Sequence, residues 1–219
     1  ERGVWVRVPP SAPTMTMLAT LDLHLWRGDR HVLRGLSFDV AAGHCLQVTG
    51  VNGSGKSTLL RALAGLLPLE SGTISWRGHD TRRDPHAFHS ELAWLGHGTG
   101  LKGDLSAPEN LRYSAGLRRD FNAADIDAAL ARVGFPHSDG RLARQMSAGQ
   151  QRRVALARVL LLDSALWLLD EPTSNLDVQG QHMFGQILST HLERGGAAVI
   201  ATHLPLTLVA DRIKALELR

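Results

Sequence analysis

Residues 50–58 combine glycines, a lysine and three hydroxyl side chains in an order that suits phosphate binding. They read GVNGSGKST and fit the pattern G-x-x-x-x-G-K-[ST], directly after an apolar run and at the start of a helix-period run. The glycines allow the backbone to curl so that successive N–H groups point at phosphate oxygens, and the following helix adds its positive N-terminal end. In such a loop Lys56 reaches the β and γ phosphates, and the Ser57 hydroxyl can be a ligand of Mg²⁺.

We therefore take the whole loop as a candidate nucleotide-binding site. The alternative is a glycine-rich turn that happens to precede a helix. The lysine, the serine and the flanking apolar strand are all present and favour the phosphate loop. The candidate residues are Gly50, Asn52, Gly53, Ser54, Gly55, Lys56, Ser57 and Thr58.

Two adjacent carboxylates, Asp170 and Glu171, follow the apolar run LWLL. An apolar strand that ends in acidic residues places them where the ligands of open α/β sheets bind. Asp170 suits a role as a Mg²⁺ ligand, directly or in the second shell, and Glu171 can orient or deprotonate an attacking water. An isolated acidic pair is usually a solvated turn, but the phosphate loop upstream favours the catalytic interpretation.

The elements that must position these residues form an α/β pattern. Residues 17–26 alternate, which predicts a half-buried strand whose apolar face holds Met17, Ala19, Leu21, Leu23 and Leu25. We predict further strands at 36–40, 45–49, 73–76 and 92–95, and a helix from Lys56 that ends before Pro68. The compact apolar runs at 165–169 and 197–201 are typical of strands covered on both faces of a parallel sheet.

The middle of the chain, residues 97–160, has few β-branched residues and repeated helix starts. Ser106 and Glu109 have the spacing of a capping box, and Asn122 is a candidate cap for the helix that follows it. We therefore predict a helical subdomain at 97–160, inserted into a single domain (17–219) whose α/β core is formed by 17–96 and 161–219. Residues 1–16 are expected to be a flexible N-terminal extension, and Cys45 is expected to pack in a strand core.

Composition and charge exclude several classes of protein. The 219 residues are 43% hydrophobic and 21% charged, which fits a globular domain rather than a disordered chain. A net charge of +3 is too small to indicate a nucleic-acid surface, so no nucleic-acid partner is expected. No apolar run approaches the roughly 20 residues that span a bilayer, so we do not expect the chain to cross a membrane by itself.

The segment MSAGQQRRV, which begins at Met146, resembles the LSGGQ signature of the ATP-binding-cassette (ABC) ATPases. A small-residue turn with a serine hydroxyl at a helix N-terminus makes a second anion site. Ala148 replaces a glycine of the family pattern. The signature's nucleotide-binding positions are matched by Ser147, Gly149 and Gln150.

Two later motifs agree with this resemblance. SNLD at 174–177 is similar to the family's D-loop, and His203 is similar to its switch histidine. The resemblance runs from about residue 17 onward and implies a P-loop NTPase ABC cassette, an α/β fold with a mixed sheet core, an antiparallel β subdomain and an inserted helical subdomain. It further implies ATP and Mg²⁺ as cofactors, and ATP hydrolysis in which Glu171 and His203 are the catalytic residues. In this family the signature of one cassette closes over the ATP bound to another, so a homodimer of cassettes is expected.

Two positions depart from the family pattern. The family usually has a glutamine where this chain has His97, and an imidazole at that place can bind Mg²⁺ or hydrogen-bond a water. The aromatic residue that normally stacks on adenine aligns with Arg27, next to Trp26, and either side chain can stack on a base.

Three segments together look like the ATPase subunit of the haem exporter of bacterial cytochrome c maturation: LGH at 95–97, the run that starts at Gln145, and HLPL from His203. This resemblance implies a role in haem export or haem-chaperone release. It also implies a peripheral position at the cytoplasmic face of the bacterial inner membrane, with separate transmembrane subunits contacting the region 98–111. We identify no residue as a direct haem ligand.

Two alternatives remain open. Cargo contacts lie on partner chains, so an ABC ATPase for another cargo, such as a lipid, a drug or an ion, fits the same motifs. A soluble ABC protein that acts as a nucleotide-gated binding module on ribosomes or DNA is less favoured, because such relatives generally carry two cassettes or long insertions.

Overall fold

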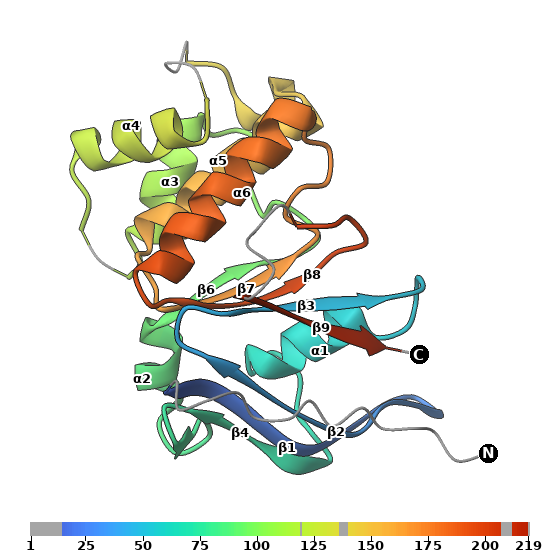
Figure 1. The fold of residues 1–219 in the computed structure, drawn as a ribbon. Helices are drawn as coiled ribbons and strands as arrows, with labels where there is room; N and C mark the ends of the chain where they lie inside the picture. Colours follow the sequence, from blue (N-terminus) through green and yellow to red (C-terminus); the bar gives the residue numbers. More distant parts are fainter. Residues whose placement is uncertain (1–14, 119, 136–139, 207–211, 219) are drawn as a thin grey trace.

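The structure, a computed structural model, describes residues 15–118, 120–135, 140–206 and 212–218 (Figure 1). Within these residues one sheet is antiparallel throughout and has the strand order β2-β1-β4-β5. Its strands are β1 (Thr16–Arg27), β2 (Arg30–Ala41), β4 (Ser71–Trp76) and β5 (His79–Asp80).

The second sheet is parallel, with the order β6-β7-β8-β3-β9 among the described strands. Its strands are β3 (Cys45–Gly50), β6 (Leu92–Leu95), β7 (Leu166–Asp170), β8 (Ala197–Ala201) and β9 (Ile213–Leu218). Parallel and antiparallel strands are thus divided between two sheets, and the predicted α/β fold class is confirmed.

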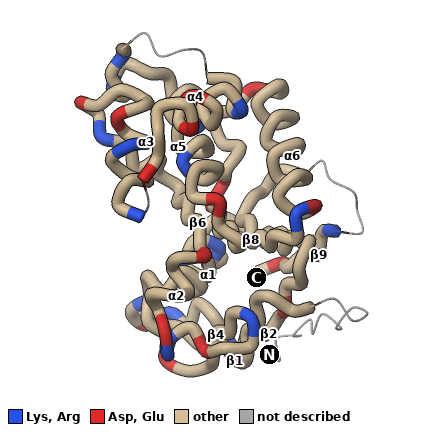
Figure 2. Tube along the Cα trace, turned by 90° about the vertical axis from the view of Figure 1, so that its left-hand side faces the viewer, with Lys and Arg blue, Asp and Glu red and all other residues tan. Residues whose placement is uncertain are grey.

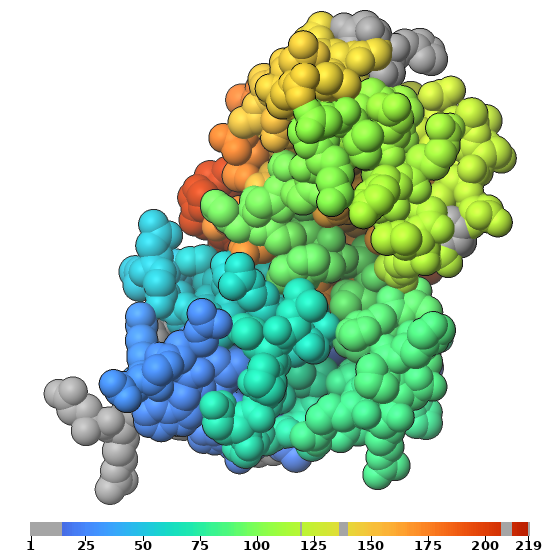
Figure 3. Space-filling view, turned by 180° about the vertical axis from the view of Figure 1, so that it is seen from behind, coloured from blue at the N-terminus to red at the C-terminus, as the bar shows by residue number. Residues whose placement is uncertain are grey.

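Helices cover the parallel sheet on both faces (Figure 1). On one side α1 (Lys56–Leu63) packs between this sheet and the antiparallel sheet. The helices on the other side are α3 (Ala107–Ala115), α4 (Ala123–Arg132), the short 3₁₀ helix at Ala143–Gln145, α5 (Ala148–Leu161) and α6 (Val178–Glu193). The short α2 (Pro85–Ser90) precedes β6. Figure 3 shows α3 and α4 at one end of the molecule and the antiparallel sheet at the other.

Two hydrophobic clusters meet at the parallel sheet because its strand residues alternate between them. In β7, Leu166 and Leu168 pack with α1 and the antiparallel sheet, whereas Trp167 and Leu169 pack with α5 and α6. All five residues of β7 and of β8 are buried, as their continuous apolar sequence predicts. Cys45 is also buried, which confirms its predicted place in a strand core, and burial raises the pKa of its thiol to about 12.

The predicted helix caps are confirmed. The backbone N–H and the hydroxyl of Ser106 both donate to Glu109 Oε2, at 2.8 and 2.6 Å, and these bonds hold the pKa of Glu109 below its ordinary value. At the start of α4, the Asp125 N–H donates to Asn122 Oδ1 at 2.9 Å.

One prediction for β1 is wrong, since Leu21 does not lie on the buried face but is 65% exposed. The cause lies at Asp22, where φ is +52° and the pairing with β2 shifts between Thr20 and Leu23. A bulge adds a residue to one strand and turns the following side chains to the other face, so the period of two does not continue through it.

The segment 97–160 holds α3, α4 and all of α5 except its last residue. The domain boundaries stay a prediction, and residues 1–14 of the predicted extension lie outside the described residues. Acidic and basic residues are interspersed along the chain (Figure 2). In the part of the chain that the structure describes, no helix is long and apolar enough to cross a membrane.

One buried amide, that of Asn110, makes four hydrogen-bond contacts with the loop before α3. Asn110 is 3% exposed, and its Nδ2 lies within hydrogen-bond distance of the carbonyls of Lys102, Leu105 and Ser106, at 3.0 to 3.1 Å. Its Oδ1 accepts the Lys102 N–H at 2.7 Å. The amide therefore fixes both ends of the segment 102–106.

We expect Asn110→Ala to lower the free energy of unfolding by about 2–4 kcal/mol. Each buried backbone group that is left without a hydrogen-bond partner costs roughly 1–3 kcal/mol. Urea denaturation measures this difference. Ser114→Ala is the control, since it removes only one hydroxyl bond to the Asn110 carbonyl and is expected to cost about 1 kcal/mol or less. Equal stabilities of the two variants would contradict the anchoring role of Asn110.

Candidate functional site

The phosphate loop connects β3 to α1 and depends on glycines at two close approaches. Gly50 has φ +141° and Gly55 has φ +106°, both outside the region that side chains favour. A Cβ at Gly50 would lie 2.4 Å from the Leu218 carbonyl oxygen, and one at Gly55 would lie 2.5 Å from Val32 Cγ1. The loop can therefore curl tightly between β9 and the antiparallel sheet only with glycine at these positions.

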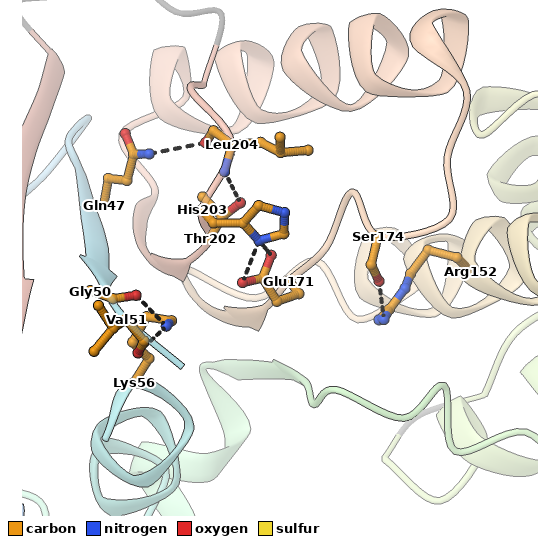
Figure 4. Close-up of polar contacts among 10 residues, drawn as sticks. All are labelled: Gln47, Gly50, Val51, Lys56, Arg152, Glu171, Ser174, Thr202, His203 and Leu204. Carbon is orange, nitrogen blue, oxygen red and sulfur yellow. Dashed lines mark hydrogen bonds and ion pairs between the residues drawn. The ribbon is translucent and has the colours of Figure 1, made fainter. Parts of the chain in front are cut away.

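The loop offers donors to an anion. No side chain caps the N-terminus of α1, so its first N–H groups face the loop without a capping partner. Lys56 lies in the first turn of this helix, and its Nζ donates to the carbonyls of Gly50 and Val51 at 2.7 and 3.1 Å (Figure 4). The Ser54 hydroxyl is buried and has no hydrogen-bond partner among the described residues.

The two carboxylates stand at the end of β7, between β6 and β8. Asp170 is 2% exposed and is the last residue of the strand, as the sequence predicts. Glu171 has φ +49°, and its N–H donates to the Ala201 carbonyl at 2.8 Å. Asp170 therefore has strand backbone and Glu171 left-handed backbone, so the two neighbouring carboxylates differ in their local geometry.

His203 follows β8 and meets Glu171 (Figure 4). Its Nδ1 lies 3.1 Å from both carboxylate oxygens, with the Glu171 side chain 14% exposed and the His203 side chain 68% exposed. The segment after β8 is tied back to β3, because Gln47 Nε2 donates to the Leu204 carbonyl at 3.1 Å. The structure therefore brings together the predicted pair of carboxylate and histidine beside the strand that leads into the phosphate loop.

The signature forms the N-terminus of α5. Ser147 is its cap, with Oγ accepting the Gln150 N–H at 3.2 Å and its own N–H donating to Gln150 Oε1 at 2.9 Å. Ser147 is exposed. Its hydroxyl and the first N–H groups of the helix therefore stand at the surface, where a second molecule can reach them.

The two departures from the family pattern have different outcomes. His97 is exposed, and the residues described contain no group of three His, Cys, Asp or Glu side chains placed to hold a metal ion. Trp26 stacks on His31 with ring centroids 4.3 Å apart, while Arg27 is exposed and pairs with Arg30 at the end of the β1–β2 hairpin. Which of the two contacts adenine stays a prediction.

Sequence reasoning missed Arg152, a buried cation on α5 that is 2% exposed. Its guanidinium donates to the Ser174 hydroxyl (Figure 4). It also donates to the carbonyls of Gly96 and His97. Burial lowers the pKa of Arg152 below its ordinary value, although the charges of Asp170 and Glu171 oppose this effect. The only sequence signal was its position just after the signature.

Comparison with known proteins agrees with these motifs. The sequence profile of the ABC transporter family matches residues 33–174. A cytochrome c biogenesis ATP-binding export protein, CcmA, of Salmonella typhi is 43% identical over 202 residues, which are 92% of this chain and 97% of that protein. The protein of the same description from Shigella sonnei is 41% identical over 204 residues, covering 93% and 97% of the two chains.

Solved structures agree on the fold. An ABC transporter ATP-binding protein from Pyrococcus furiosus superposes with a TM-score of 0.77 at 25% identity, covering 91% of this chain and 96% of that one. A dimeric ATP-binding cassette in a post-hydrolysis state, bound to ADP and phosphate, has a TM-score of 0.77 at 22% identity, covering 86% and 88%. By its family match, its relatives and its fold, this chain belongs to the ABC transporter family and is one of its ATP-hydrolysing cassettes.

Proposed function

We propose that the chain is the ATP-hydrolysing subunit of an export complex that serves cytochrome c biogenesis, energising haem export or the release of a haem chaperone. The observation that carries the hydrolytic part is the contact between Glu171 and His203 at the carboxyl ends of β7 and β8, beside β3, whose last residue, Gly50, accepts a bond from Lys56. The 43% identity to a cytochrome c biogenesis ATP-binding export protein supports the cellular role.

The phosphate loop binds ATP in this proposal. Backbone N–H groups of residues 52–58 surround the phosphates, and the Lys56 ammonium exchanges its bonds to the Gly50 and Val51 carbonyls for bonds to phosphate oxygens. Ser147, Gly149 and Gln150 bind the γ-phosphate of a nucleotide held by a second cassette. The adenine rests against the end of the β1–β2 hairpin, where Trp26 and Arg27 lie.

Hydrolysis needs a base and a group that orients it. Glu171 accepts the proton of the attacking water, and His203, already 3.1 Å from that carboxylate, holds it in place and senses the γ-phosphate. The end of β8 fixes the Glu171 backbone, because the Glu171 N–H donates to the Ala201 carbonyl. The proton therefore passes to a carboxylate whose position is set by two neighbouring strands.

The residues also suit Mg²⁺. Asp170 is a buried carboxylate next to the loop, and burial of such a charge is costly unless a cation or hydrogen bonds compensate it. Ser57 and Asp170 would hold the ion, with phosphate oxygens and water supplying the other ligands that Mg²⁺ prefers. A bound Mg²⁺ neutralises phosphate charge. His97 is an additional candidate ligand or water-binding group.

The working unit is a homodimer of cassettes bound to separate transmembrane subunits. The exposed signature of one protomer contacts the nucleotide that is bound to the phosphate loop of the other, so a single chain forms only part of each site. We place the complex at the cytoplasmic face of the bacterial inner membrane, with the chain peripheral and the region 98–111 as its membrane-subunit contact. That region is ordered by Asn110 and continues into the exposed side chains of Tyr113 and Leu117.

We expect Glu171→Gln to reduce ATP turnover by at least about 100-fold, because loss of a general base typically costs 10²–10⁴-fold. ATP binding is expected to stay within about threefold of the original, since the change keeps the shape of the side chain. Phosphate release and calorimetric titration with Mg-ATP measure the two quantities. Glu193→Gln on α6 is the matched control. Full ATP turnover by Glu171→Gln would contradict the role of Glu171 as the base.

A second experiment tests the partner and the cargo. We expect Tyr113→Asp with Leu117→Asp to remove co-purification with membrane subunits from detergent-solubilised membranes, because charge replaces apolar contact area at an interface. Leu66→Asp, at another exposed leucine after α1, is expected to leave co-purification intact. Mass spectrometry then identifies the captured subunits. Haem-handling proteins support the proposal, whereas a permease of unrelated type would show that the cargo is different.

A further inference from the structure

Arg152 joins three segments that are far apart in the sequence. Its Nη2 lies 2.8 Å from the His97 carbonyl oxygen and 2.6 Å from Ser174 Oγ, and its Nη1 lies 3.3 Å from the Gly96 carbonyl oxygen. These acceptors belong to the segment after β6 and to the loop after β7. Arg152 itself belongs to the second turn of α5, whose N-terminus is the signature.

The loop after β7 carries this contact back to Glu171. The Ser174 N–H donates to the Glu171 carbonyl at 3.0 Å and closes a turn directly behind the candidate base. The guanidinium therefore holds the far side of the turn from which the Glu171 carboxylate projects. A shift of α5 relative to β7 would break this bond or move the turn.

A second contact between the same helix and the same loop is independent of Arg152. A Cβ at Gly149 would lie 2.6 Å from the Asn175 carbonyl oxygen, so the first turn of α5 rests directly on the loop backbone. Ser147 and Gln150 flank this point. The signature and the loop after Glu171 are thus packed together without room for a side chain between them.

The charge of Arg152 is held inside the protein rather than at its surface. The side chain is 2% exposed, and its Nε has no hydrogen-bond partner among the described residues. The carboxylates of Asp170 and Glu171 are the charges that stabilise it. A buried cation that depends on these carboxylates responds when their surroundings change, as they do when phosphates and a proton arrive.

We propose that Arg152 is a positioning residue that couples the Glu171 turn and the His97 segment to the signature helix, so that the nucleotide state of one site sets the position of the signature that completes the other. This inference rests on the proposed function and extends it to communication between the two sites of the dimer. In this proposal Arg152 does not bind nucleotide itself but acts through the Glu171 turn, the His97 segment and the helix that begins at Ser147.

The test uses the complete chain and the variants Arg152→Lys, Arg152→Met and Ser174→Ala. Lysine keeps the charge but lacks the planar fork that spans three acceptors. We expect both Arg152 variants to lower kcat for ATP at least tenfold while KM changes less than threefold, because the phosphate loop is untouched. Ser174→Ala is expected to lower kcat in the same direction by a smaller factor, and to have little further effect when combined with Arg152→Met.

A second readout is ATP-driven dimerisation in the Glu171→Gln background, measured by size-exclusion chromatography with light scattering. We expect Glu171→Gln to dimerise with Mg-ATP and the double variant Arg152→Lys with Glu171→Gln to stay monomeric. Arg158→Gln is the matched control, a half-buried arginine further along α5 whose desolvation lowers its pKa in the same direction. It is expected to lower Tm comparably and to retain dimerisation.

The outcomes separate this inference from the proposed function. If the unmodified chain hydrolyses ATP, Glu171→Gln does not, and Arg152→Lys keeps both kcat and dimerisation, the coupling role is wrong and the proposed function stands. If Glu171→Gln hydrolyses ATP at the original rate, the proposed function itself fails. Loss of kcat by Arg158→Gln equal to that of Arg152→Lys would show a structural role only. If Arg152→Met does not fold, the lysine and Ser174 variants decide the question.

Discussion

The backbone hydrogen bonds that align β3, β7 and β8 set the geometry on which the rest of the site depends. Ala201 at the end of β8 pairs with Val48 in β3 and with Asp170 in β7, so β7 and β8 end at one level, and β3 continues for two more residues along β9. The next bonds along the ladder are Glu171 N–H to Ala201 and Thr202 N–H to Val48. The phosphate loop, the carboxylate of Glu171 and the imidazole of His203 therefore lie near one another, because each directly follows the end of its strand. Parallel sheets collect such groups at their carboxyl edge as a matter of topology.

This alignment requires a sheet whose two faces are both covered and shielded from water. The continuous apolar strands meet this need because their successive side chains pack alternately on the two faces. Residues 197, 199 and 201 pack toward α1, while 198 and 200 pack toward α5 and α6. Small alanines dominate β8, so the helices approach closely on either side. The polar groups at the end of such a sheet are partly enclosed by the same packing. Burial of Asp170 and Arg152 follows from their position on these elements, and each charge is retained because opposite charges and carbonyl oxygens lie nearby.

Local chemistry made much of this predictable from the sequence. The glycines and lysine of the phosphate loop, the capping box at Ser106 and the apolar run of β8 each act within a few residues of chain. Features that depend on distant partners were not predictable. Leu21 was assigned to the wrong face because the bulge at Asp22 arises from pairing with two strands. Strand β9, IKALEL, mixes charged and apolar residues because it lies at a sheet edge, and gave no clear signal. The acceptors of Arg152 lie 22 to 56 residues away, beyond any periodicity.

Lys56 and Glu171 each have an internal partner in this conformation. Lys56 donates to two loop carbonyls, and the Glu171 carboxylate lies against His203. Under the proposed function, ATP must displace the first pair before the ammonium can meet phosphate, and the second pair must open or reorient before a water can lie between Glu171 and the γ-phosphate. The first exchange replaces bonds from the Lys56 ammonium to neutral carbonyls by ion pairs with phosphate oxygens, so the gain appears only when phosphates are present. Such a site stays inactive in hydrolysis until ATP binds. Before that, neither the Lys56 ammonium nor the Glu171 carboxylate lowers its free energy by leaving its internal partner.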